Sequence, residues 1–358
     1  MKIFRQKLYL GIVPLLLTLN AAGQQSWPSP EVEQMYFHAK EYTMRGDFND
    51  AVTTYKQAIL LAPGKMELYK GLGSALFSSG KYKEAEQALQ PLCTGQQADD
   101  TCFRLLATVK AALADSKGAL ATLQKGISRF PNSGLLYNEC GKILWSENKK
   151  EKALNAWLDG IARQPTYGPD YYQASLTYLN TNKVIWGLLY GESFLALKHD
   201  TANDDSLKAR LFIGYKKLFD GFAVTGENYL VTNPAANFET AVLKTYAQLT
   251  PVISDGITTE NLTMVRVRFL MDWFSTYATK YPCALFSYQD TLIKNGRFDI
   301  WNEWLFGKAE SETEFNAWNK FHEGAIYRTL DWQTNHAFAP SNIENYNDRN
   351  MDGLFEKK

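Results

Sequence analysis

The sequence has few of the residues and patterns that enzymes use for chemistry. It contains 4 histidines and 4 cysteines in 358 residues, and it has no Gly-x-Ser-x-Gly turn of the kind that carries a hydrolase nucleophile. His322-Glu323 lacks the second histidine that a zinc-protease helix places four residues after the first. Gly71-Leu72-Gly73 lacks the third glycine of a nucleotide-binding loop, and no strand is predicted before it. We therefore expect no catalytic residues and no cofactor.

The four cysteines do not have the paired spacing of a zinc site, so no metal is expected. Cys93 and Cys102 flank the predicted turn between two helical blocks, and an oxidising compartment could join them in a disulfide. This pairing stays open, because the sequence does not give the bridging geometry. Cys140 and Cys283 are expected to be buried as small apolar side chains.

Neither sign of charge is in excess. The chain has 38 basic and 38 acidic residues, and removal of the three cations in residues 1–23 leaves 35 against 38. Proteins that follow a phosphate backbone carry a basic patch or stripe, which this composition does not favour. Nucleic acid is therefore not expected as a partner.

Long apolar runs are lacking beyond the N-terminus. There, three cations precede an apolar run from Leu8 to Leu19, and small residues follow at 21–23, which predicts a cleaved signal peptide over 1–23. No later segment has the roughly 20 apolar residues of a transmembrane helix. No cysteine directly follows the run, so we expect a free periplasmic or secreted protein without a lipid anchor. An uncleaved N-terminal anchor is the alternative.

What the sequence does contain is a regular repeat. Ala51, Ala85, Ala119 and Ala153 stand 34 residues apart, each at the same place in a helix–turn–helix pattern. Proline, which cannot continue a helix, follows the second helix of three blocks, as Pro63, Pro131 and Pro165. A unit of this kind buries its apolar face only by stacking on its neighbours. The first half is therefore predicted to be a helical-repeat array.

These blocks resemble the tetratricopeptide repeat over about residues 31–199. The second block matches best, through Tyr69, Leu72, Gly73, Leu76, Gly80, Tyr82, Ala85 and Leu89. A fifth block keeps the frame but loses the alanine and the proline. The resemblance implies an all-α solenoid of four clear repeats and a degenerate fifth, with a concave face that binds a protein or peptide.

Residues 200–340 keep helical spacing without the regular period. The piece from Leu285 through Leu305 repeats the helix–Gly-x-aromatic–helix pattern, which suggests a divergent unit. Five of the 9 tryptophans fall here, as Trp273, Trp301, Trp304, Trp318 and Trp332. Core packing is their expected role, and stacking on a sugar is the alternative. The tail, residues 341–358, is rich in Asn and Asp and is expected to fray.

The resemblance also implies which side chains face a ligand. In this family the second, fifth, ninth and twelfth positions of the first helices line the groove. The partner-binding candidates at these positions are Tyr36, Lys40, Lys70, Phe77, Arg104, Asn138, Lys142 and Trp145. The four cations among them would suit an acidic segment or a free carboxylate. An ordinary solvated face is the alternative for the same residues.

Together these patterns predict an exported, non-enzymatic scaffold that binds a protein or peptide in the groove of a helical solenoid. The alternative is a glycan-binding or hydrolytic protein with its site in the aromatic C-terminal half.

Overall fold

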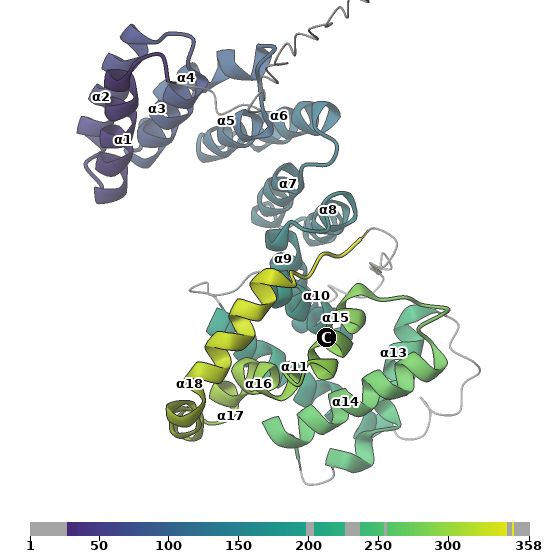
Figure 1. The fold of residues 1–358 in the computed structure, drawn as a ribbon. Helices are drawn as coiled ribbons and strands as arrows, with labels where there is room; N and C mark the ends of the chain where they lie inside the picture. The colour runs from purple at the N-terminus through teal and green to yellow at the C-terminus, as the bar shows by residue number, and fades with distance from the viewer. Residues whose placement is uncertain (1–26, 198–203, 226–236, 254–255, 342–345, 347–358) are drawn as a thin grey trace, which may run out of the picture. The chain divides into compact units, whose positions relative to one another are not determined.

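The computed structural model describes residues 27–197, 204–225, 237–253, 256–341 and 346. Every regular element in these ranges is helical, which confirms the predicted all-α class (Figure 1). No helix within the described ranges is long and apolar enough to cross a membrane. The predicted signal peptide, 1–23, lies outside the described residues.

The chain divides into two compact units, residues 1–75 and 76–358, and each is described by itself. The division falls inside the second block. Within the second unit, one apolar core continues from Ala153 on α8 (Lys150–Arg163) to Phe338. The predicted domain boundary at residue 200 stays a prediction.

The first unit contains α1 (Pro30–Arg45), α2 (Phe48–Leu61) and most of α3 (Met66–Ser78). Ser29 caps α1, because its hydroxyl accepts a hydrogen bond from the Val32 amide at 3.3 Å, and Pro30 fits the first helical turn. Ala51 on α2 has no exposed surface. The expected helix–turn–helix pair is therefore present in the first block.

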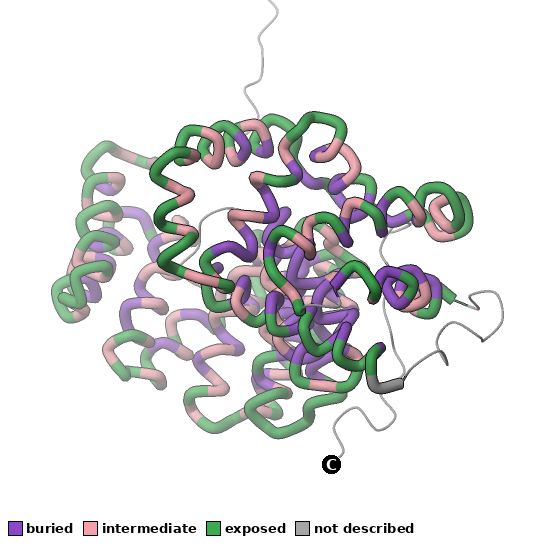
Figure 2. Tube along the Cα trace, turned by 90° about the horizontal axis from the view of Figure 1, so that it is seen from below, coloured by how far each residue is buried: buried purple, intermediate pink, exposed green. Residues whose placement is uncertain are grey.

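The second unit continues the array. Its helices run in pairs, as α4 (Tyr82–Thr94), α5 (Asp100–Ala112) with α6 (Ser116–Arg129), α7 (Gly134–Ser146) with α8, and α9 (Gly168–Leu179) with α10 (Val184–Leu197). Ala85, Ala119 and Ala153 are each fully buried. Along α4, α5, α6 and α7, buried positions recur among exposed ones, as an amphipathic repeat requires, whereas α10 is buried along almost its whole length. Figure 2 shows buried and exposed positions along the backbone trace. Small side chains at the buried positions let the helices approach closely.

The turns within the pairs have one backbone geometry despite different residues. Gly80 has φ 76°, Ala114 has φ 62° and Asn148 has φ 58°, so each adopts the left-handed conformation. Asn tolerates this region, whereas the Cβ of alanine is crowded there. Two of these turns have alanine or asparagine in place of glycine, yet their backbone keeps the same left-handed conformation.

The remaining helices cover the last pair of the array. They are α11 (Asp204–Thr225), α13 (Phe238–Ala247), η1 (Thr250–Ile253), α14 (Thr259–Thr276), α15 (Ala284–Lys294), α16 (Phe298–Asn302), the π-helical turn η2 (Glu303–Gly307), α17 (Lys308–Glu310) and α18 (Glu312–Asn335). Between α15 and α16, Gly296 has φ 61°, the same turn geometry as in the repeats. The aromatic half is helical, as its spacing predicts.

The turn at Ala114 yields a test of the repeat geometry. A left-handed alanine carries about 1–2 kcal/mol of strain, while glycine costs about 0.5–1 kcal/mol of additional chain entropy. We expect Ala114→Gly to raise the melting temperature of the chain, measured by circular dichroism. The matched control is Ala121→Gly on the exposed face of α6, which we expect to destabilise by about 1 kcal/mol. Equal losses in both variants would contradict the turn geometry.

Candidate functional site

Five polar and aromatic residues on α5 and α7 make up the candidate site. The Thr108 hydroxyl on α5 donates to the Glu139 carboxylate on α7 at 2.9 Å, which places the two helices side by side. Lys142 Nζ lies 3.8 Å from the other carboxylate oxygen of Glu139, and its side chain is 51% exposed. Trp145 is 41% exposed and Arg104 is half-buried. We call Arg104, Thr108, Glu139, Lys142 and Trp145 the α5–α7 face.

Glu139 was missed by the sequence prediction. The family positions used there skip this residue, which directly follows the fifth position of its helix. The charge pattern could have identified it, because Glu139 stands three residues before Lys142, a spacing that predicts an ion pair on one helix. The α5–α7 face is therefore mixed in charge, with two cations and one carboxylate.

Asn138, predicted to face a ligand, is buried. It is 1% exposed, its side-chain amide donates to Asp170 on α9 at 3.0 Å, and its carbonyl accepts from the Trp157 indole at 3.3 Å. Helix α9 packs over this position, so Asn138 links two helical pairs and offers no groove surface. The expectation for Asn138 is corrected accordingly.

The other predicted groove residues have different surroundings. Phe77 is half-buried, with its ring 5.4 Å from that of Tyr82. In the first unit, Tyr36 is half-buried beneath Trp27, with ring centroids 4.7 Å apart. Lys40 on α1 is exposed, and Lys70 on α3 is half-buried. Two of the four predicted cations lie in each unit, so a single groove that contains all four stays a prediction.

Cys93 on α4 and Cys102 on α5 are held as thiols in the structure. Burial, followed by the neighbouring Cys102, raises the pKa of the Cys93 thiol to about 12. Disulfides form through the thiolate, so this burial slows oxidation near neutral pH. The Cys93–Cys102 disulfide, which the sequence leaves open, stays a prediction. Cys283 is buried as expected, while Cys140 is half-buried.

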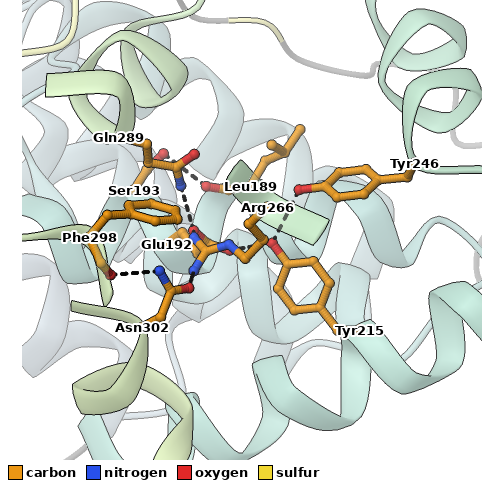
Figure 3. Close-up of polar contacts among 9 residues, drawn as sticks. All are labelled: Leu189, Glu192, Ser193, Tyr215, Tyr246, Arg266, Gln289, Phe298 and Asn302. Carbon is orange, nitrogen blue, oxygen red and sulfur yellow. Dashed lines mark hydrogen bonds and ion pairs between the residues drawn. The ribbon is translucent and has the colours of Figure 1, made fainter. Parts of the chain in front are cut away.

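A buried polar cluster was not predicted from the sequence at all (Figure 3). Arg266 on α14 donates to Glu192 on α10 and to Asn302 on α16. Glu192 also accepts from Gln289 at 2.6 Å and from the Tyr215 hydroxyl at 2.5 Å. These five side chains are each at most 5% exposed. The cluster therefore joins the last helix of the array to four helices of the C-terminal half.

The chemistry of this cluster fits a structural role. Burial, and then the charge of Glu192, raises the pKa of Tyr215 well above its usual value, so the phenol stays neutral. Arg266 and Glu192 neutralise each other, which a buried ion pair requires. No member has an exposed surface on which a substrate could lie.

The tryptophans of the C-terminal half divide into two kinds. Trp273 and Trp301 are 0% and 2% exposed, which is the expected core packing. Trp318 is half-buried and stacks on His322, with ring centroids 4.2 Å apart. Within the described ranges, no group of three or more His, Cys, Asp or Glu side chains is arranged to hold a metal. Trp301 therefore has no exposed ring surface on which a sugar could stack.

Comparisons with known proteins agree with the fold. Residues 42–113 match the family model of the tetratricopeptide repeat, which confirms the resemblance seen in the sequence. A human protein O-mannosyl-transferase, TMTC1, is 23% identical over 181 residues, or 48% of this chain. The chain spans about a fifth of the length of that relative, 20%.

Solved structures of repeat proteins are also similar. A tetratricopeptide repeat protein of Thermus thermophilus is 16% identical, with a TM-score of 0.41 over 51% of this chain and 98% of that one. One from Parabacteroides merdae is 14% identical, with a TM-score of 0.38 over 72% of this chain and 97% of that one.

The buried pair of Asn138 and Asp170 yields a pH prediction. Burial raises the pKa of Asp170 well above its usual value, and Asn138 and Lys142 only partly offset this. The folded state therefore binds the proton more tightly than the unfolded state, so this carboxyl lowers stability as the pH rises through its folded pKa. We expect Asp170→Asn, which keeps an acceptor for Asn138, to melt at a higher temperature than the wild type at pH 8.

The advantage of Asp170→Asn should shrink as the pH falls toward about 4, the usual pKa of aspartate. Asp220→Asn serves as the control, since it removes the same charge at an exposed position of α11. A difference in melting temperature that does not change with pH would contradict the assignment.

Proposed function

We propose that the tetratricopeptide repeats of this chain act as a non-enzymatic scaffold, which holds an extended segment of a partner protein on the α5–α7 face. The tetratricopeptide fold is a protein-interaction scaffold, and this gives the general role. The observation that supports the particular surface is Trp145, a large aromatic side chain that stays 41% exposed on the first helix of a repeat.

The chemistry of the face favours a ligand that carries both an apolar group and a carboxylate. Trp145 offers a flat apolar anchor, and aromatic anchors commonly dominate the energy of peptide binding. Lys142 lies 3.8 Å from Glu139 on α7, and Arg104 adds a second positive charge on α5. Glu139 repels a ligand carboxylate, so Arg104 and Lys142 are the groups that would bind it.

We further propose that the scaffold works outside the cytoplasm. The support is the N-terminal pattern of cations, an apolar run and small residues in 1–23. The partner would then be another exported or envelope protein.

The α5–α7 face is tested by reversing its charge. We expect the double change Arg104→Glu and Lys142→Glu to lower recovery of the partner from the exported fraction by about tenfold or more, since about 1.4 kcal/mol of binding energy is a factor of ten. The measurement is quantitative mass spectrometry after affinity capture with the full chain.

The matched control is Lys117→Glu with Lys125→Glu, which makes the same change in net charge on exposed positions of α6. Capture by the α6 variant should match the wild type. Equal capture by both variants would remove the α5–α7 face from the proposal.

A further inference from the structure

An aromatic pocket lies on the side of the second unit formed by α10, α13 and α15. Its lining includes Trp186, Tyr190, Phe238 and Cys283, and also Tyr346 from the C-terminal tail. Trp186, Tyr190 and Phe238 are each at most 5% exposed. The pocket shares no residue with the α5–α7 face, so it stands independently of the proposed function.

Tyr346 occupies this pocket as a ligand would. Its ring lies parallel to that of Phe238, with centroids 4.0 Å apart and planes 6° apart. The edge of Tyr281 faces it at 6.3 Å. The Tyr190 hydroxyl donates to the Tyr346 carbonyl at 3.1 Å. The site thus recognises both an aromatic ring and the peptide carbonyl of the same residue.

This contact is unexpected from the sequence, because the tail from residue 341 is mostly polar and has few apolar residues. A single aromatic ring in a polar segment is typical of a peptide anchor, since the ring supplies apolar area while its neighbours stay hydrated.

The pocket also contains a hydrogen-bond donor that Tyr346 does not use. The indole N–H of Trp186 is buried and has no acceptor among the described residues, and a space of about 20 Å³ remains in the pocket. A buried donor without an acceptor carries a free-energy penalty that a ligand acceptor removes. The pocket is thus suited to a polar atom as well as to a ring.

We propose that this pocket is a binding site for an aromatic residue on an extended peptide, and that Tyr346 of the same chain occupies it. Because the tail is tethered, its effective concentration at the pocket is high. An external aromatic peptide therefore binds only in the fraction of molecules whose tail has left the site.

The test uses the full chain and a fluorescent peptide with the sequence of residues 341–351. Binding is measured by fluorescence anisotropy. We expect Tyr346→Ala to bind this peptide with an apparent affinity at least tenfold higher than the wild type, because its own ring no longer fills the site. Tyr346→Phe keeps the ring and the backbone carbonyl, so it should behave like the wild type.

Two further variants separate recognition from a general structural effect. A peptide with alanine in place of the tyrosine should not bind Tyr346→Ala. In the Tyr346→Ala chain, Tyr190→Phe removes only the donor to the peptide carbonyl and should weaken binding several-fold. Tyr327→Ala, at a 70% exposed position of α18, should not differ from the wild type.

Circular dichroism confirms that the variants are folded. The proposal is overturned if Tyr346→Ala does not bind the peptide, if it binds no better than the wild type, or if the tyrosine and alanine peptides bind equally.

Discussion

The close approach of paired helices is the constraint on which the second unit depends. Ala85, Ala119 and Ala153 are fully buried, and a Cβ on Gly141 would clash with the indole of Trp157. A larger side chain at these positions would separate the helices and disturb the stacking. With the small residues inside, the polar side chains of α5 and α7 are left on the surface. The surface proposed to bind a partner is therefore a consequence of the packing.

The array was predictable because its signals are local and repeated. Alanine at a period of 34 residues and proline after three second helices specify the pairs, and the backbone keeps the left-handed turn even at Ala114. The site was predictable only in part. The groove positions of the family are assigned on the assumption that the first helix of each repeat is uncovered. Here α9 covers Asn138, whose side chain bonds to Asp170. This bond joins residues 32 positions apart, and no local pattern announces it.

The C-terminal helices cover the apolar face at the end of the array, which a sixth repeat would otherwise cover. A solenoid needs a terminal cap, because its last unit would leave an apolar face exposed. Here the buried carboxylate of Glu192 on the last array helix binds Arg266 and Gln289, which lie 74 and 97 residues further along the chain. Helical spacing predicts these helices, whereas the partners of Glu192 follow only from their three-dimensional arrangement. The aromatic half is thus structurally part of the array's end.

The central claim is that the exposed faces of the first helices bind a partner. Site-specific photocrosslinking in cells that produce the full chain tests it most directly, with a photoreactive amino acid at Trp145 and, for comparison, at Ile213, which is 57% exposed on α11. The account predicts a discrete crosslinked protein at position 145 that is absent at position 213. The same products at both positions, or a discrete product at position 213 alone, would contradict it.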